Sequence, residues 1–201
     1  MVKEHHVIYV PGLNDQRKGY ELFINRWHVY GVIPHVHRIG WNDEEKSFKP
    51  KLTRLVKVVD ELLKQGNTVS LVGGSAGGSA VLNALLDQPK INAVVNICGR
   101  LRAGDHVFPS LEFAARKSPS FKDSVMTFEK KETQMTLKAR KKVLNLIPIW
   151  DEVVPKSTVP LQGAYNQTLP SVEHMMSGFL GMTIFAPLII KFIKEQAEKK
   201  L

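Results

Sequence analysis

Short apolar segments alternate with amphipathic segments along the chain, and this alternation constrains the fold more than any other feature of the sequence. Residues 7–10 form an apolar run that ends at Pro11 and Gly12, as a buried strand does before a turn. Residues 50–63 repeat apolar side chains at the spacing of one helix face, and residues 68–72 return to a strand-like run. Such alternation predicts an α/β fold, in which helices cover both faces of a mostly parallel central sheet.

The remaining segments extend this pattern to a sheet of about six strands. We expect further strands at residues 32–39, 91–97, 143–149 and, shorter, 162–166, and further helices at residues 18–30, 75–86 and 175–198. No linker rich in Pro, Gly and Ser divides the chain, so residues 1–201 are expected to form a single domain. From about residue 100 to residue 142 the sequence is polar and basic and interrupts the alternation. We therefore predict that this stretch forms a small helical lid over the strand ends.

The chain is basic, with 28 Lys and Arg against 19 Asp and Glu and a net charge of +9. These cations are spread along the sequence, and the densest cluster, at residues 138–142, has no interleaved aromatic side chains on which bases could stack. We therefore expect a solvated basic face and no nucleic-acid partner. Cys98 is the only cysteine, which excludes an intrachain disulfide and fits a reducing compartment. The N-terminus lacks the apolar stretch of a signal peptide, so we expect a cytoplasmic protein.

Residues 175–193 carry a single charge, on Lys191, and approach the length of a membrane span. Gly178, Gly181 and Pro187 lie within this segment. They favour a buried C-terminal helix, broken near Pro187, over a transmembrane span. A peripheral contact of this surface with a membrane stays open.

The turn after the strand predicted at residues 68–72 has the pattern Gly-x-Ser-x-Gly, formed by Gly73, Ser75 and Gly77. Small residues on both sides of the serine allow a sharp turn from strand to helix, which raises the hydroxyl above the sheet at a helix N-terminus. Negative charge that develops on a substrate oxygen is favoured there. A phosphate-binding loop would require a lysine, and a dinucleotide-binding turn a different glycine spacing, so we predict no cofactor.

With this turn, the chain resembles the α/β-hydrolase family over nearly its whole length, as a compact serine-esterase-like member. In that family an acid and then a histidine follow the serine in chain order. The resemblance implies that Asp151, directly after the strand predicted at residues 143–149, is the acid and that His174 is the base. His174 is the only histidine C-terminal to Asp151. Glu152 and Asp105 are the alternatives for the acid.

The resemblance also implies an oxyanion hole formed by two backbone N–H groups. Ala76, directly after the serine, supplies one of them. The other is expected from the turn after the first strand, where Pro11 replaces the histidine of the family's His-Gly-x segment. Leu13 is the first choice and Asn14 the alternative, and Gly12 permits the backbone angles that would direct such a donor inward.

These residues predict a serine hydrolase that acts on a small-molecule acyl ester, in the manner of a carboxylesterase or lipase, through an acyl-enzyme. Thioesterase, peptidase or acyltransferase activity on the same fold, or a noncatalytic binding protein, are the alternatives. His35 and His37 have no further ligands near them in the sequence, so we predict no metal site. Arg100 and Arg102 follow a predicted strand and are either surface charges or partners of an acidic substrate group.

Overall fold

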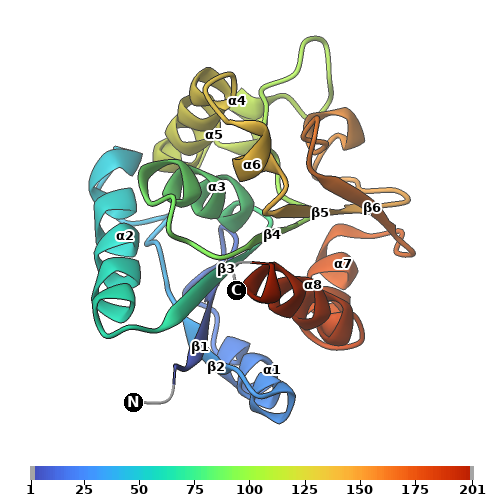
Figure 1. The fold of residues 1–201 in the computed structure, drawn as a ribbon. Coiled ribbons are helices and arrows are strands. Elements are labelled where there is room, and N and C mark those ends of the chain that lie inside the picture. The colour runs from blue at the N-terminus through green and yellow to red at the C-terminus, as the bar shows by residue number, and fades with distance from the viewer. Residues whose placement is uncertain (1–2, 200–201) are drawn as a thin grey trace.

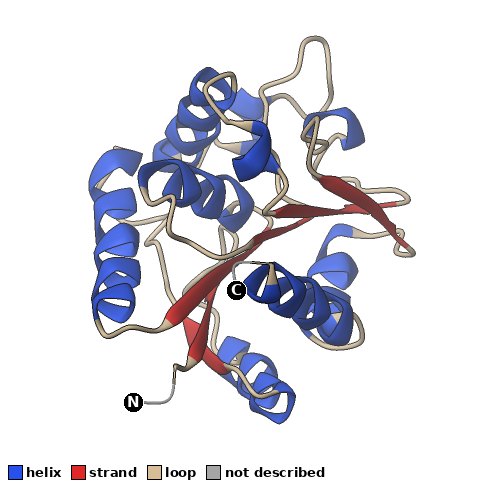
Figure 2. Ribbon diagram, viewed as in Figure 1, coloured by secondary structure: helices blue, strands red, loops and turns tan. Residues whose placement is uncertain are grey.

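The computed structural model describes residues 3–199 and contains a six-stranded sheet (Figures 1 and 2). Its strands are β1 (His5–Val10), β2 (Ile33–Val36), β3 (Thr68–Gly74), β4 (Val94–Ile97), β5 (Val143–Pro148) and β6 (Tyr165–Leu169). Their order across the sheet is β2-β1-β3-β4-β5-β6, and every neighbouring pair is parallel. The prediction of a mostly parallel sheet of about six strands is confirmed.

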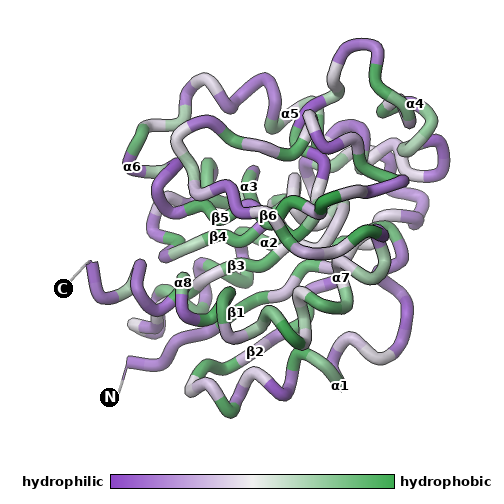
Figure 3. The backbone as a smooth tube through the Cα atoms, turned by 90° about the vertical axis from the view of Figure 1, so that its right-hand side faces the viewer, coloured by the Kyte–Doolittle hydropathy of each residue, from purple (hydrophilic) through white to green (hydrophobic). Residues whose placement is uncertain are grey.

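The central strands are apolar on both faces because both faces are covered. In β1, Ile8 and Val10 belong to one hydrophobic core, whereas Val7 and Tyr9 belong to a second core on the opposite face. Successive side chains of a strand point to opposite faces, so an uninterrupted apolar run serves two cores at once. Figure 3 shows hydrophobic segments along these strands, between helices that carry more hydrophilic stretches.

Helices on each face of the sheet bury one apolar side against it (Figure 1). One face is covered by α2 (Phe48–Lys64), α3 (Gly77–Asp87) and α5 (Pro119–Glu132), and the other by α1 (Tyr20–Ile24), the 3-10 helix Asn25–Tyr30, α7 (His174–Met182) and α8 (Ala186–Glu198). Two further short helices are α4 (Leu111–Ala114) and α6 (Leu137–Arg140), and a 3-10 turn spans Lys156–Thr158. Helices on both faces confirm the predicted layering.

The chain changes direction across the sheet between β1 and β3. From β1 it moves outward to β2, then returns past β1 to β3 and continues to β4, β5 and β6. Val10 at the end of β1 pairs with Gly73 near the end of β3. In open parallel sheets, ligands bind outside the carboxyl ends of the strands at such a reversal. The turns after β1 and β3 therefore lie where a site is expected.

Several predicted elements differ in their bounds from the observed ones: the strands expected at residues 32–39 and 91–97 are the shorter β2 and β4, and two other differences coincide with glycine turns. The helix expected at residues 18–30 is α1 followed by a 3-10 helix, which ends at Gly31 with φ +70. The short strand expected at residues 162–166 begins only at Tyr165, because Gly163 forms a turn with φ +80.

Part of the stretch predicted to be a lid is a sheet-covering helix. Phe121, Val125 and Phe128 lie on one side of α5 and are buried in the same core as α2 and α3. A parallel strand pair needs a crossover connection, and α5 covers the sheet within the connection from β4 to β5. For residues 99–118, which begin at the carboxyl end of β4, the lid stays a prediction.

The C-terminal apolar segment forms two helices rather than one. Helices α7 and α8 meet at an angle of 60°, and Pro187 lies in the first turn of α8. Ile189, Ile190 and Ile193 of α8 are buried in the second core. Within residues 3–199 no single helix is long and apolar enough to cross a membrane. The bent pair of α7 and α8 has the required length and apolar composition only when the two helices are taken together.

Candidate active site

Ser75 occupies a sharp turn between β3 and α3. Its φ of +53 lies in the left-handed region, which few non-glycine residues adopt. A side chain at Gly77 would overlap the carbonyl oxygen of Val10, and one at Gly73 would overlap the carbonyl oxygen of Gly77. The start of α3 therefore approaches the ends of β1 and β3 too closely for any residue but glycine at these two positions. This close packing holds the Ser75 backbone in its strained geometry.

His174 connects Ser75 to Asp151 through both of its ring nitrogens. The Nε2 atom lies 2.8 Å from the hydroxyl oxygen of Ser75, and the Nδ1 atom lies 2.8 Å from Oδ2 of Asp151. The second carboxylate oxygen of Asp151 accepts hydrogen bonds from the backbone N–H groups of Val153 (2.8 Å) and Val154 (2.7 Å). These bonds fix the carboxylate toward the ring, so the three side chains form one continuous hydrogen-bonded chain.

The alternative acids lie elsewhere. Glu152 accepts a hydrogen bond from the backbone N–H of His174 at 3.1 Å, not from the ring. Asp105 is exposed in the connection after β4. Glu173 caps α7, since its carboxylate accepts the backbone N–H groups of Met175 and Met176. Among the three candidate acids, Asp151 is therefore the one that contacts the imidazole.

Burial and charge act in opposite directions on His174. The side chain is nearly buried, and burial by itself favours the neutral imidazole. The hydrogen bond to Asp151, followed by the interactions with Cys98 and the negative charge of Asp151, outweighs this effect and raises the pKa of His174 above its ordinary value of 6.5. The environment thus stabilises the protonated, imidazolium form of His174.

The turn after β1 packs directly against the serine. A side chain at Gly12 would place its Cβ atom 2.8 Å from Cβ of Ser75. The Pro11 carbonyl oxygen accepts a hydrogen bond from the indole Nε1 of Trp41 at 3.1 Å. The Leu13 carbonyl oxygen accepts one from the side-chain amide of Asn42 at 2.6 Å. Two peptide planes of the turn are therefore oriented by side chains that follow β2.

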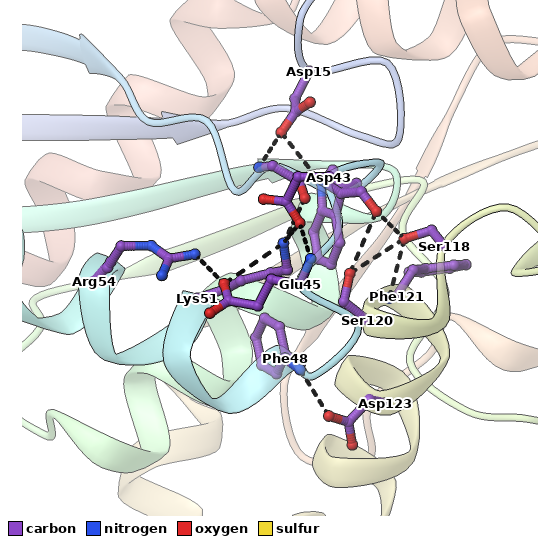
Figure 4. A network of polar contacts seen from close by, with 12 residues as sticks. Asp15, Asp43, Glu45, Phe48, Lys51, Arg54, Ser118, Ser120, Phe121 and Asp123 are labelled. Atoms are coloured by element: carbon purple, nitrogen blue, oxygen red, sulfur yellow. Dashed lines mark hydrogen bonds and ion pairs between the residues drawn. The ribbon is translucent and has the colours of Figure 1, made fainter.

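A buried polar network holds those side chains in place (Figure 4). The Asp15 carboxylate, which is fully buried, accepts the backbone N–H groups of Gly40 (2.6 Å) and Trp41 (3.4 Å). The ammonium group of Lys51, also fully buried, donates to the Gly40 carbonyl. On the other side, the Ser118 hydroxyl donates to the Trp41 carbonyl at 2.6 Å. The network joins the connections that follow β1, β2 and β4 around the turn beside Ser75.

Comparison with solved structures identifies the fold that carries these side chains. Est1E from Butyrivibrio proteoclasticus matches with a TM-score of 0.67 and 17% identity, over 98% of this chain and 89% of that one. A monoacylglycerol lipase from Paleococcus ferrophilus matches with a TM-score of 0.61 and 15% identity, over 95% of this chain and 94% of that one. A structure from work on carboxylesterases of Nitrososphaera gargenis matches with a TM-score of 0.66 and 11% identity, over 98% of this chain and 92% of that one. The chain has the α/β-hydrolase fold. No protein-family model matches the sequence, and no curated protein matches it either.

Ser75 lies in the strand-to-helix turn between β3 and α3. Asp151 and His174 follow it in chain order, after β5 and after β6. The structure brings together all three side chains predicted from the sequence. The oxyanion-hole roles of Leu13 and Ala76 stay predictions, since they concern a bound substrate.

Sequence analysis did not connect Cys98 with the site. Cys98 follows β4 directly, has a φ of +47 and is buried. Its sulfur, a carboxylate oxygen of Asp151 and a ring nitrogen of His174 all lie within 4.8 Å of one another. Only its position in the sequence indicates this proximity. Cys98 directly follows β4, and Ser75 directly follows the neighbouring strand β3.

Arg100 and Arg102 donate to groups of the protein itself. The Arg100 guanidinium is buried and donates to the carbonyl oxygens of Arg102 at 3.0 Å and Pro109 at 2.7 Å. Arg102 pairs with the Glu132 carboxylate at 2.6 Å. These bonds favour a structural role in the connection after β4 over binding of an acidic substrate group.

His35 lies in the edge strand β2, where it pairs with Ile8 of β1. Its Nε2 atom is 2.8 Å from Nδ1 of His6, and the two rings are stacked at 5.1 Å. Burial lowers the pKa of His37 below its ordinary value. Among residues 3–199, the His, Cys, Asp and Glu side chains with metal-ligand spacing are those of Cys98, Asp151 and His174.

Proposed function

We propose that this protein is a serine hydrolase that cleaves carboxylic esters through an acyl-enzyme. The observation that carries the proposal is the continuous hydrogen-bonded chain from Ser75 through His174 to Asp151. A serine hydroxyl is a weak nucleophile by itself and requires a base within hydrogen-bonding distance, which must in turn be oriented by a third group. Both requirements are met within one site.

In the proposed reaction, Nε2 of His174 takes the proton of Ser75 while the serine oxygen attacks the carbonyl carbon of the ester. The tetrahedral intermediate carries a negative oxygen, which we assign to the backbone N–H groups of Leu13 and Ala76. The imidazolium then gives its proton to the departing alcohol oxygen, and the carbon–oxygen bond breaks. The products are a free alcohol and an acyl group esterified to Ser75.

Water completes the cycle. His174 takes a proton from a water molecule, the water oxygen attacks the acyl carbonyl, and the imidazolium returns the proton to the oxygen of Ser75. The carboxylic acid leaves and the enzyme is restored. Asp151 stays ionised throughout and stabilises the imidazolium in both halves.

Exposed apolar side chains next to the triad in the chain suit the acyl part of such a substrate. Trp150 precedes Asp151, and Met175 and Met176 follow His174, with exposed fractions of 57%, 56% and 50%. Val153 is also exposed. The apolar character of these neighbours supports an ester with an apolar group, as do solved structures of the same fold that are described as lipases and carboxylesterases.

The test is a panel of p-nitrophenyl esters of graded acyl length, with a thioester and an anilide for comparison. We expect ester hydrolysis by the wild-type protein, with Ser75→Ala slower by about a thousandfold or more. A fluorophosphonate probe should label the wild-type protein and Ser79→Ala, a substitution one helical turn further on, but not Ser75→Ala. Equal ester turnover by wild type and Ser75→Ala would overturn the proposal. A preference for the thioester or the anilide would reassign the substrate class.

A further inference from the structure

Three side chains of the kinds that bind Zn²⁺ meet beside the proposed nucleophile. The donor atoms of Cys98, Asp151 and His174 lie within 4.8 Å of one another, although they come from the ends of three separate strands or loops. Thiolate, carboxylate and imidazole are the groups that bind Zn²⁺, at roughly 2.0–2.3 Å from the ion. Ligands of one tetrahedral ion are therefore about 3.5 Å apart. Side-chain movements of about 1 Å would bring these three donors to that spacing.

The charges of the three groups match a divalent cation. A thiolate from Cys98 and the carboxylate of Asp151 supply two negative charges, and a neutral His174 supplies none. A bound dication would leave the buried group electrically neutral, which a low-dielectric site favours. Binding releases the thiol proton to solvent, and it releases one ring proton where His174 starts as an imidazolium. The neutral imidazole keeps its remaining proton on the nitrogen that the metal does not bind. Cys98 and the side chains of Asp151 and His174 are all at least nine-tenths buried, so few water molecules compete as ligands.

We propose that Cys98, Asp151 and His174 form a binding site for Zn²⁺ or Cd²⁺, and that an ion bound there switches off hydrolysis. If the ion binds Nε2 of His174, it occupies the electron pair that would accept the serine proton. If it binds Nδ1, it replaces the hydrogen bond to Asp151. Both arrangements stop proton transfer to and from Ser75. Metal binding stands on the three ligands alone, whereas the inhibition rests on the proposed function.

Binding can be measured without any activity. Cd²⁺ is titrated into Ser75→Ala, and the ultraviolet absorption band of a cadmium–thiolate bond is followed. Because Cys98 is the only cysteine, such a band reports on this site alone. We expect the band to saturate at one ion per protein, and to be absent from Ser75→Ala that also carries Cys98→Gly. Absence of the band from Ser75→Ala itself would overturn the proposal.

Glycine is the appropriate replacement because Cys98 has a φ of +47, which glycine adopts without strain. Cys98→Ser serves as a second variant with nearly the original side-chain volume. The circular dichroism spectrum and melting temperature of each variant establish that it is folded before any titration.

Inhibition is measured by titrating Zn²⁺ into the metal-free wild-type enzyme and into Cys98→Gly, each compared with its own metal-free rate. We expect wild-type activity to fall and to return on addition of EDTA, and Cys98→Gly to need at least tenfold more Zn²⁺ for the same fall. Equal sensitivity of the two proteins would contradict the proposed role of Cys98. If the protein cleaves no ester, the proposed function fails, while the cadmium titration still decides whether the metal site exists.

Discussion

The indole Nε1 of Trp41 donates a hydrogen bond to the carbonyl oxygen of Pro11 at 3.1 Å. A peptide plane is rigid, so fixing this carbonyl also fixes the direction of the N–H group of Gly12 and the path of the turn that continues to Leu13. Trp41 does not reach the reacting atoms. It is a positioning residue for the turn in which we place the second oxyanion donor.

Replacement of Trp41 by Phe keeps an aromatic ring between Phe48 and Phe121 but removes the indole donor. We expect kcat/KM to fall by about tenfold to a hundredfold, since a misdirected donor loses part of what a full oxyanion-hole donor contributes. The affinity for a boronic-acid analogue of the tetrahedral intermediate should fall by a similar factor. Trp27→Phe is the matched control, because Trp27 also donates its indole N–H to a backbone carbonyl, that of Met182, at 2.9 Å. Equal losses of analogue affinity in both variants would argue for a general structural effect.

Asp151 and Glu152 are adjacent carboxylates with different contacts, so they form a natural pair for substitution. Asp151→Asn should lower kcat by about 10⁴, because the amide no longer stabilises the imidazolium and favours the wrong ring tautomer. Glu152→Gln should change kcat by less than about tenfold, since Glu152 accepts from the backbone N–H of His174 and not from its ring. Steady-state kinetics on the best ester checks both values. A larger loss of kcat in Glu152→Gln than in Asp151→Asn would reassign the acid to Glu152.

The pH dependence of the reaction follows from the raised pKa of His174. Protonated imidazole cannot accept the serine proton, so activity should be lost as the pH falls and gained as it rises through the pKa of this group. Because Asp151 raises that pKa, the midpoint of kcat/KM against pH should lie above 6.5. In Asp151→Asn the residual activity should show a lower midpoint. A wild-type midpoint below 6.5 would contradict this account of the site.

Gly12 should tolerate no side chain, because an added Cβ would lie 2.8 Å from Cβ of Ser75. We expect Gly12→Ala to reduce kcat/KM by about a hundredfold or more, since either the serine or the proposed oxyanion turn must move. Gly178→Ala provides the control: Gly178 lies in α7 and an added Cβ there meets no atom within 4 Å. That variant should keep its activity and gain stability by up to about 1 kcal/mol. Fluorophosphonate labelling rates report the reactivity of Ser75 in each variant, and melting temperatures report its stability.

The assignment of α5 to the core rather than to a lid can be tested by stability. Phe128 in α5 is fully buried, whereas Phe108 in the preceding connection is 83% exposed. Phe128→Ala should lower the free energy of unfolding by about 3–5 kcal/mol. Phe108→Ala should change it by less than about 0.5 kcal/mol. Urea denaturation of both variants gives these differences, and a small effect of Phe128→Ala would restore the lid interpretation for α5.

The sequence by itself determined the fold class and gave a short set of candidates for the site. An apolar run or an amphipathic repeat depends on neighbours in the chain, so the order of strands and helices was readable before any contact was known. The Gly-x-Ser-x-Gly turn is partly local: Gly73 is required by the close approach of β3 to the start of α3, whereas Gly77 is required by the approach of α3 to the end of β1. The family resemblance then implied His174 and, with Glu152 and Asp105 as alternatives, Asp151.

Only the tertiary structure decided between groups that are alike in sequence. Asp151 and Glu152 are neighbouring carboxylates, and the direction of each side chain selects the one that meets the ring. The apolar side of α5 lies among polar and basic residues, so its role as a core helix appears only where it packs. Cys98 and Trp41 reach the site from other strands and connections. Such contacts depend on strand order and register, which bring together residues far apart in the chain and which local patterns do not encode.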